Sequence, residues 1–197
     1  MSDAGLKVIR RSAFTATPWK NGGGITHEAI RVPPTGDTFL WRVSVAQIDA
    51  AGPFSDFSRY DRKMVLLQGG GIALEFAGGE HRALRSVGDW VEFDGATPAR
   101  CELLDGPCVD LNLMVSQSLR TAARVERLCE PTLVAAARGE ATLIFGIQGP
   151  LSLDCRGESV RLETWDLAIL KGCSTHLSKM TPGEDSAPIA VFIATIS

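Results

Sequence analysis

The sequence lacks a concentration of charge of either sign. Its 197 residues include 20 Lys and Arg and 23 Asp and Glu, giving a formal net charge of -3, and the cations are scattered along the chain. Proteins that bind nucleic acid gather their Lys and Arg side chains on one face or stripe. We therefore do not expect nucleic acid as a partner.

Cysteine is also sparse. There are five cysteines, an odd number, and none of them forms a C-x-x-C pair: Cys101, Cys108, Cys129, Cys155 and Cys173. Disulfide frameworks use paired cysteines, and zinc knuckles need close spacing. The pattern argues against both and fits a reducing compartment.

Long hydrophobic runs are absent as well. No stretch approaches the roughly 20 apolar residues that a membrane-spanning helix needs. The opening segment MSDAGLKVIRR has no apolar core of the kind found in signal peptides. We expect no membrane partner and a cytoplasmic location.

What the sequence does contain is a series of short apolar and β-branched runs separated by Gly and Pro. Such runs at close spacing predict an all-β sandwich or barrel. The predicted strands are Leu40–Ile48, Lys63–Leu67, Gly71–Phe76, Trp90–Phe93, Val109–Val115, Ala141–Ile147, Leu151–Cys155, Leu167–Leu170 and Pro188–Ile196. The best candidate for a helix is Ser118–Arg127, with a turn as the alternative.

Three of these segments recur in the same order in the second half, with Gly70 and Gly149 separated by 79 residues. The matched pairs are Gly70–Gly79 with Gly149–Glu158, Gly88–Gly95 with Trp165–Gly172, and Asp110–Val115 with Ile189–Ala194. The second pair aligns Asp89 with Asp166. An ordered match of three blocks favours an internal duplication.

Each repeat resembles half of a two-domain cupin, with a strand, a Gly-rich turn, a second strand and a G-D-like segment. The resemblance implies a bicupin, in which two cupin-like β-barrels or sandwiches follow in tandem. We expect residues 1–117 to form the N-terminal barrel with the ligand pocket. Residues 118–197 would form the C-terminal barrel, the two packing as one compact unit.

The resemblance also locates where a metal-binding cupin would keep its His and Glu ligands. In the first repeat these positions hold Arg62, Ala99 and the segment Ser55–Ser58, none of which supplies a metal ligand. In the second repeat only His176 and Glu140 are available, fewer than the three or four ligands that such a site needs. We predict no metal and no cofactor.

Two predicted strands alternate apolar and polar side chains, and alternate residues of a strand face opposite sides. The polar faces carry Arg42, Ser44 and Ala46 in the first strand and Asp110, Asn112 and Met114 in the second. These faces either meet solvent or line the barrel lumen, and the cupin resemblance favours the lumen. Asp110 could then pair with Arg42, leaving Arg62 for an anion, since a buried unpaired charge is costly.

The segment WKNGGGITHE, Trp19–Glu28, places three glycines between polar residues. Glycine permits positive φ and close backbone approach, so an ordinary turn before a strand is one interpretation. Walker spacing is absent, which argues against a phosphate loop. In the other interpretation, the side chains that flank the glycines converge on one polar ligand: Lys20, Asn21, Thr26 and Glu28.

The blocks WKNGGGITHE, FLWRVSVAQI, GPFSDFSRYDR, EFDG and LLDGPCVDLNLM together resemble the HutD/Ves family, most strongly over Trp19–Met114. The resemblance implies a bicupin without a metal-dependent reaction, associated with histidine utilisation through binding of an intermediate such as urocanate or formylglutamate. It implies these pocket residues: Lys20, Asn21, Thr26, Glu28, Arg42, Ser44, Phe54, Ser55, Arg62, Asp110, Asn112 and Met114.

Three functional hypotheses follow. The first is a non-catalytic protein that binds a small anionic carboxylate metabolite. The second is a metal-free enzyme, an isomerase or lyase, that uses Glu28, Asp61 or His27 as acid or base. The third is an interaction module. Because bicupins associate through sheet edges, a homodimer is an expected assembly.

Overall fold

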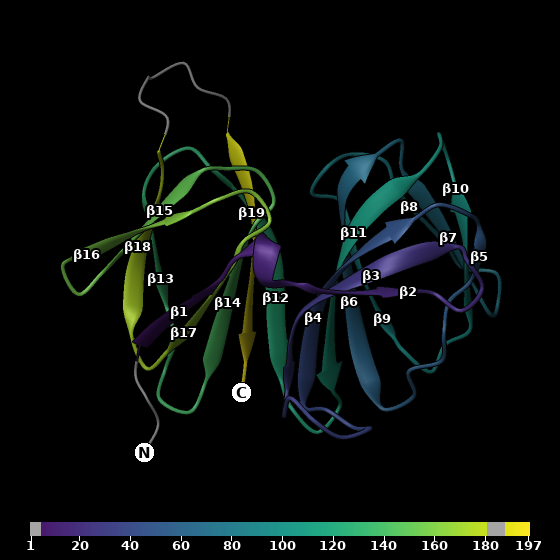
Figure 1. The fold of residues 1–197 in the computed structure, drawn as a ribbon, viewed down its shortest axis with the longest axis horizontal. Coiled ribbons are helices and arrows are strands. Elements are labelled where there is room, and N and C mark those ends of the chain that lie inside the picture. The colour runs from purple at the N-terminus through teal and green to yellow at the C-terminus, as the bar shows by residue number, and fades with distance from the viewer. Residues whose placement is uncertain (1–4, 181–187) are drawn as a thin grey trace. The chain divides into compact units, whose positions relative to one another are not determined.

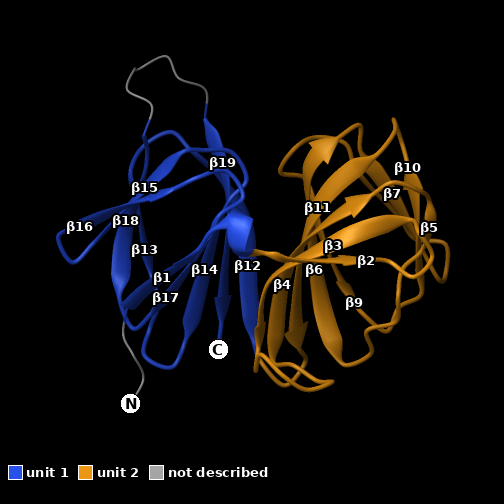
Figure 2. Cartoon of the chain, viewed as in Figure 1, with its two compact units in different colours: residues 1–13, 120–197 blue, residues 14–119 orange. Residues whose placement is uncertain are grey.

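The computed structural model describes residues 5–180 and 188–197 and divides the chain into two units (Figures 1 and 2). The first four residues of the N-terminal segment considered above lie outside this range. Unit 2 spans residues 14–119, and unit 1 comprises the described residues of 1–13 and 120–197. Apart from one short 3-10 turn, η1 (Arg11–Ala13), the described elements are all β-strands.

Unit 2 is built from two antiparallel sheets. The six-stranded sheet has the order β2 (Thr15–Pro18), β3 (Gly24–Val32), β4 (Trp41–Ile48), β11 (Cys108–Ser116), β6 (Tyr60–Gly69) and β9 (Trp90–Asp94). The four-stranded sheet has the order β5 (Gly52–Pro53), β10 (Ala99–Leu103), β7 (Ile72–Phe76) and β8 (His81–Leu84).

Unit 1 also has two antiparallel sheets. Its five-stranded sheet has the order β1 (Gly5–Ile9), β17 (Leu167–Lys171), β14 (Ala141–Gly146), β19 (Ile189–Ile196) and β12 (Thr121–Leu128). Its four-stranded sheet has the order β13 (Thr132–Ala135), β18 (Ser174–Lys179), β15 (Leu151–Cys155) and β16 (Glu158–Leu162). The fold is therefore all-β, as predicted.

The two units share one strand order. In unit 2 the order β4–β11–β6–β9 faces β5–β10–β7–β8, and in unit 1 the order β12–β19–β14–β17 faces β13–β18–β15–β16. The three segment pairs matched in the sequence lie on β7 and β15, β9 and β17, and β11 and β19. This shared order is what an internal duplication would produce.

The predicted helix Ser118–Arg127 is wrong. Residues 121–128 form the edge strand β12, whose eight residues pair antiparallel with β19 from Thr121↔Ile196 to Leu128↔Ile189. Its burial alternates along the first five residues, as expected for a strand with one face toward a neighbour. Pairing with a buried strand has overridden the helix preference of the Ala, Arg and Glu residues.

The expected assignment of residues 1–13 to the first barrel is also corrected. Strand β1 pairs antiparallel with β17 from Gly5↔Lys171 to Ile9↔Leu167. Close by, Arg10 Nη1 donates to Asp166 Oδ2 at 2.8 Å and to the Arg161 carbonyl at 2.7 Å. The start of the chain therefore completes unit 1, and unit 2 begins at Phe14.

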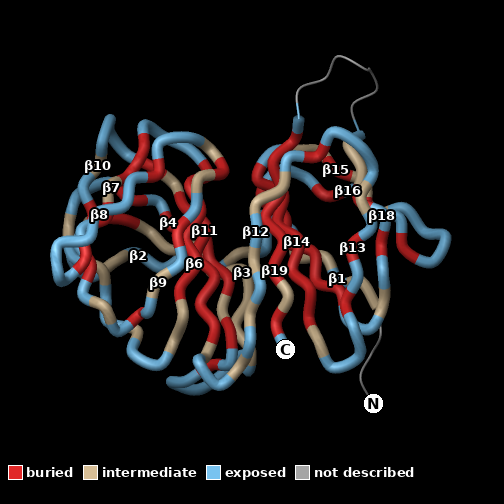
Figure 3. The backbone as a smooth tube through the Cα atoms, turned by 180° about the vertical axis from the view of Figure 1, so that it is seen from behind, coloured by how far each residue is buried: buried red, intermediate tan, exposed pale blue. Residues whose placement is uncertain are grey.

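Each unit has its own apolar core. Figure 3 shows buried residues running along β6 and β11 in unit 2 and along β14 and β19 in unit 1. The core of unit 2 includes Ile48, Met64, Leu66 and Leu74, between its two sheets. No described residue belongs to a helix with the length and apolar character needed to cross a membrane.

Candidate functional site

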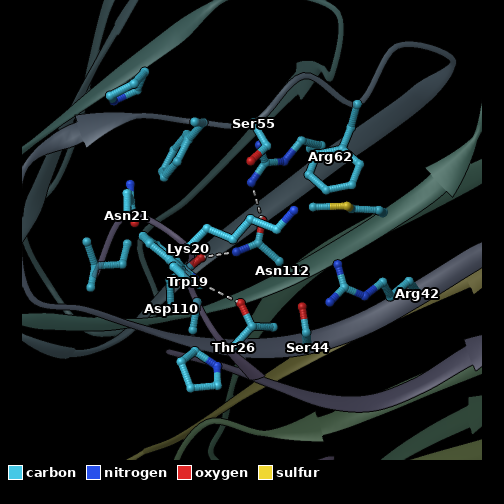
Figure 4. A pocket seen from close by; sticks show the side chains of 17 residues that line it. Trp19, Lys20, Asn21, Thr26, Arg42, Ser44, Ser55, Arg62, Asp110 and Asn112 are labelled. Carbon is cyan, nitrogen blue, oxygen red and sulfur yellow. Dashed lines mark hydrogen bonds between the residues drawn. The ribbon is translucent and has the colours of Figure 1, made fainter. Parts of the chain in front are cut away.

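A cavity of about 660 Å³ opens within unit 2, lined mainly by the six-stranded sheet and two loops (Figure 4). This volume is in the usual range for small-molecule sites. The sheet supplies Pro18, Thr26, Arg42, Ser44, Ala46, Ile48, Arg62, Asp110, Asn112 and Met114. The turn after β2 and the segment around β5 supply Trp19, Lys20, Asn21, Pro53, Phe54, Ser55 and Phe57.

Strand alternation accounts for the polar wall. Successive residues of a strand point to opposite faces, so Arg42, Ser44 and Ala46 share one face of β4. Across the ladder, Asn112 of β11 lies opposite Ser44, and Met114 lies opposite Arg42. The polar faces that the sequence left open between solvent and lumen thus line the cavity.

Arg62, Asn112 and Asp110 form a hydrogen-bonded chain along this wall, drawn with dashed lines in Figure 4. Arg62 Nη2 donates to Asn112 Oδ1 at 2.8 Å, and Asn112 Nδ2 donates to Asp110 Oδ2. All three residues are buried, with exposed fractions of 4%, 6% and 0% for Arg62, Asn112 and Asp110. A cation and a carboxylate are therefore held in the same buried wall with an amide between them.

Aromatic rings surround the Arg62 guanidinium. Its central carbon lies 4.9 Å from the ring centroid of Phe54, 5.0 Å from that of Phe93 and 5.5 Å from that of Phe57. Such cation–π contacts partly replace the hydration that the guanidinium loses. Burial still lowers the pKa of Arg62 to about 10, although the nearby Asp110 carboxylate opposes the shift. Arg62 remains positively charged at neutral pH.

Asp110 is strongly perturbed in the opposite sense. Burial raises the pKa of its carboxyl to about 7, although the Arg62 guanidinium and the backbone N–H of Asp110 itself oppose the change. Of the buried polar side-chain atoms in the described residues, only three have no hydrogen-bond partner: Arg31 Nε, Arg62 Nε and Asp110 Oδ1. Two of these three atoms belong to residues that line the cavity, a donor on Arg62 and an acceptor on Asp110.

The glycine segment forms the tight turn between β2 and β3 and supplies one edge of the cavity. Trp19 Nε1 donates to Thr26 Oγ1 at 2.7 Å, across the turn, and Asn21 Oδ1 accepts from the backbone N–H of Gly23 at 3.0 Å. Gly22 has a φ of 71°, which favours glycine. A Cβ on Gly24 would lie 2.2 Å from the Gln47 carbonyl oxygen, so the third glycine permits close approach to β4.

Of the twelve pocket residues predicted from the sequence, eleven line this cavity and Glu28 does not. Glu28 Oε2 instead accepts from Arg42 Nε at 2.6 Å, and its other oxygen lies 3.4 Å from Arg31 Nε. Glu28 therefore offsets part of the positive charge that Arg42 brings to the cavity.

The predicted pairing of Asp110 with Arg42 is wrong. In the ladder between β4 and β11, Asp110 lies opposite Ala46, whereas Arg42 lies opposite Met114. Four residues along a strand correspond to about 13 Å, too far for direct contact between these two side chains. Arg42 pairs with Glu28, and Asp110 bonds Asn112.

None of the residues proposed from the sequence as acid or base lines the cavity. Glu28 lies beside the wall, paired with Arg42, whereas Asp61 and His27 face away from the cavity. Asp61 accepts from Gln117 Nε2 at 3.2 Å, on the face of β6 opposite to that of Arg62. His27 alternates with Thr26 on β3 and therefore faces away from it.

Sequence reasoning did not select several residues that line the cavity. Trp19 and Phe57 stood inside quoted motifs but were not assigned to the pocket. Ala46 was placed on the face of Arg42 and Ser44 but not among the pocket residues, and extending that alternation to the end of β4 would have found Ile48. Pro18 and Pro53 carry no comparable signal in the sequence.

The residues present do not fit a cupin metal centre. The positions that the sequence pattern assigns to metal ligands in unit 2 hold the buried cation Arg62, the apolar Ala99 and the loop Ser55–Ser58. A fixed positive charge repels a metal cation. Within residues 5–180 and 188–197, no three His, Cys, Asp or Glu side chains gather as a metal site would require.

The equivalent interior of unit 1 is apolar. Ile189, Val191 and Ile193 of β19 occupy the positions matched with Asp110, Asn112 and Met114, and they belong to the buried core of the unit. His176 is exposed on β18. The polar wall is thus a property of unit 2.

Comparison with known proteins agrees with the family resemblance found in the sequence motifs. The family model described as HutD matches residues 11–186. An uncharacterised 21.2 kDa protein from the hutC 3′ region of Pseudomonas putida is 34% identical over 169 residues, covering 85% of this chain and 87% of that protein. Protein Ves of Cronobacter sakazakii is 34% identical over 137 residues, covering 69% of this chain and 73% of Ves.

Solved structures agree with the fold. A conserved protein of unknown function from Pseudomonas aeruginosa PAO1 matches with a TM-score of 0.86 at 28% identity, covering 98% of this chain and all of that one. HutD from Pseudomonas fluorescens SBW25, in a formate condition, matches with a TM-score of 0.78 at 28% identity over 97% and 98% of the two chains. An oxalate decarboxylase from Lactobacillus farciminis, at 9% identity and a TM-score of 0.62 over 100% and 86% of the chains, shares the fold alone.

Proposed function

Because the chain belongs to the HutD family, we propose that it binds a small carboxylate metabolite in the unit 2 cavity and thereby modulates histidine utilisation. The observation that carries this proposal is Arg62, a buried guanidinium on the cavity wall whose Nε has no partner. A carboxylate is the natural acceptor for such a donor, since hydrogen bonds between two charged groups are the stronger ones.

The charge balance of the cavity supports an anionic ligand. Lys20, Arg42 and Arg62 line it against the single carboxyl of Asp110, which burial makes easier to protonate. The aromatic rings of Trp19, Phe54 and Phe57 give the rest of the wall an apolar surface suited to a planar or hydrocarbon part of a ligand.

Two intermediates of histidine breakdown are suitable candidate ligands: urocanate, a planar heteroaromatic acid, and formylglutamate, which has two carboxylates. Both are small relative to the cavity of about 660 Å³. The family association supports choosing them, because the Pseudomonas putida relative is named for the hutC region.

The test is a binding measurement with the intact protein and with Arg62→Ala. Ligand at one hundred times its dissociation constant should stabilise the wild type by roughly 2.7 kcal/mol, which is visible in a thermal unfolding experiment. We expect Arg62→Ala to remain folded but to lose this stabilisation. Arg124→Ala, an exposed position on β12, serves as the matched control.

Normal binding by Arg62→Ala would refute the role of the guanidinium. No stabilisation of the wild type by urocanate, formylglutamate or related carboxylates would count against the proposal as a whole. Circular dichroism of each variant separates lost binding from lost folding.

A second candidate function is metal-free acid–base catalysis on the same ligand, with Asp110 as the proton carrier. The observation that favours it is the pKa of Asp110, raised to about 7, because catalytic acids and bases work best near the operating pH. Turnover of a bound acid by the wild type, abolished by Asp110→Asn, would favour catalysis over binding alone. Unchanged ligand after prolonged incubation would favour binding.

A further inference from the structure

We infer that the ligand of the unit 2 cavity carries a hydrogen-bond donor, an N–H or O–H group, in addition to its carboxylate, and that Asp110 selects for this donor. The inference rests on the proposed function and adds a second recognition element to it. It assigns Asp110 as a specificity-determining residue, a role that the charge balance of the cavity alone would not suggest.

The hydrogen bonds that link Arg62, Asn112 and Asp110 have a fixed direction. A guanidinium only donates hydrogen bonds, so the Asn112 atom that meets Arg62 Nη2 must be the carbonyl oxygen. The amide nitrogen of Asn112 then faces Asp110 and donates to Oδ2. The direction of every hydrogen bond in the chain is therefore set by Arg62.

At each end of this series of hydrogen bonds, one side-chain atom has no partner. At one end Arg62 Nε has a hydrogen to donate, and at the other Asp110 Oδ1 has lone pairs to accept with, yet both atoms are buried without a partner. A buried polar atom left unpaired costs about 1–3 kcal/mol. A ligand with an acceptor at one end and a donor at the other would satisfy both.

The spacing defines the class of ligand further. The bonded atoms Arg62 Nη2 and Asp110 Oδ2 are separated by one side-chain amide and two hydrogen bonds, roughly 6–8 Å along that path, and the unpaired atoms belong to the same two end groups. A carboxylate and a donor several bonds apart can span this distance, as in a heteroaromatic acid with a ring N–H or an N-acyl amino acid. A simple fatty acid or a plain aromatic acid would leave Asp110 Oδ1 unpaired.

Among the titratable groups around Asp110, the Asp110 carboxylate is the one that can accept a hydrogen bond from a ligand. The charged or titratable groups that interact with it are Arg62 on β6, Cys101 on β10 and Cys108 on β11. Burial raises the pKa of both cysteine thiols, that of Cys108 to about 12, so both remain neutral. At pH 8.5 Asp110 is mainly ionised and accepts from a ligand donor.

Replacement of Asp110 by asparagine should reverse the polarity of the free atom. The oxygen of the new amide must accept from Asn112 Nδ2, because that nitrogen only donates. The new amide nitrogen then stands where Oδ1 stood, and a donor replaces an acceptor. Asp110→Asn should therefore disfavour ligands with a donor while Arg62 still holds their carboxylate.

The experiment compares matched acids by calorimetry at pH 8.5, with the intact protein. Urocanate is paired with cinnamate, which replaces the imidazole by a phenyl ring, and formylglutamate with glutarate, which lacks the formamide N–H. For whichever pair binds, we expect the donor-bearing acid to bind the wild type at least about tenfold more tightly than its partner. Asp110→Asn should remove or invert this ratio, and Asp154→Asn, an exposed position on β15, should keep it.

The outcomes separate the two proposals. If no acid binds in a manner that depends on Arg62, the proposed function fails. If both acids of a pair bind the wild type equally and through Arg62, the proposed function stands and the inference about a donor is overturned. A donor preference that survives in folded Asp110→Asn also overturns it. If that variant does not fold, the ratio measured with the wild type decides alone.

Discussion

At the scale of single residues, the cavity wall of unit 2 holds two buried groups of opposite charge, and no hydrogen bond joins them directly. Asn112 separates the Arg62 guanidinium from the Asp110 carboxyl and bonds both. Desolvation penalises the charged form of each group, and mutual attraction repays only part of the cost. Burying these two charged groups therefore lowers the free energy of unfolding, as expected where function requires buried charge.

The pKa of Asp110 predicts how stability depends on pH. The folded-state pKa is raised to about 7, whereas an unfolded aspartate titrates near about 3.9. Between these values the folded protein keeps a proton that the unfolded chain has lost. The contribution of Asp110 to the free energy of unfolding is therefore fully present below about pH 4 and is lost as pH rises to about 7.

Urea unfolding at several pH values between 4 and 8 checks this prediction. We expect Asp110→Asn to flatten the fall in stability over that range, while Asp154→Asn should leave the wild-type profile unchanged. Identical profiles for wild type and Asp110→Asn would show that Asp110 titrates normally.

Glu28 gives a prediction about affinity. Its carboxylate lies 2.6 Å from Arg42 Nε and offsets the charge of that arginine beside the cavity. We expect Glu28→Gln to strengthen binding of a carboxylate by roughly two- to fivefold at low salt, the usual size of a partly exposed ion pair. Glu126→Gln, which removes the partner of Arg124 in unit 1, is the matched control for net charge. Weaker binding by Glu28→Gln, measured by calorimetry, would contradict this interpretation.

At the scale of strands, alternation made much of the cavity wall predictable. The period of two placed Arg42 with Ser44 and Asp110 with Asn112 without any knowledge of the sheet order. The partner of Arg42 was not predictable in the same way, because it depends on which strands are neighbours. The neighbour is β3, which brings Glu28 opposite Ser44 and beside Arg42.

Strand β12 shows where local preference fails. Its sequence TAARVERL contains good helix formers, and no glycine or proline interrupts it. The segment nevertheless pairs along its whole length with β19, and Arg124 Nε lies 3.1 Å from Glu126 Oε2, two residues away on the same face. Tertiary pairing at an edge leaves little trace in the sequence of the edge strand.

Gly24 is the residue on which the close packing of β3 and β4 depends. A Cβ there would lie 2.2 Å from the Gln47 carbonyl oxygen and 3.2 Å from the Trp19 ring. We expect Gly24→Ala to destabilise the protein by about 1–3 kcal/mol in urea unfolding, since the backbone of β4 has to move. Gly52→Ala, where a Cβ would meet nothing within 4 Å, is the control and should be nearly neutral. Equal stability of the two variants would rule out the close approach.

At the scale of the whole molecule, the repeat in the sequence corresponds to two units with one strand order. The aligned residues Asp89 and Asp166 also share a role, since each carboxylate accepts from at least one backbone N–H of its own turn. The placement of β1 was not predictable, because a strand of five residues carries no sign of a partner more than 150 residues away. Its pairing follows only from the sheet order, because without β1 the strand β17 would be at the edge of the sheet.

The closure of unit 1 by the start of the chain gives a testable prediction. Asp166, nearly fully buried, accepts from Arg10 Nη1 at 2.8 Å, the Arg11 N–H at 2.8 Å and the Glu163 N–H at 3.1 Å. We expect Asp166→Ala to cost about 2–3 kcal/mol in chemical unfolding, because three donors lose a charged acceptor. Asp154→Ala, at an exposed position, should cost little. If the two variants were equally stable, Asp166 would not hold the N-terminal segment in place.

The most direct measurement is a crystal structure of the protein with a bound acid that stabilises it in solution. We predict one molecule in the cavity of unit 2, with a carboxylate oxygen within hydrogen-bond distance of Arg62 Nε and an N–H or O–H group of the ligand donating to Asp110 Oδ1. Density for the acid in unit 1, or in unit 2 without contact to Arg62, would contradict it.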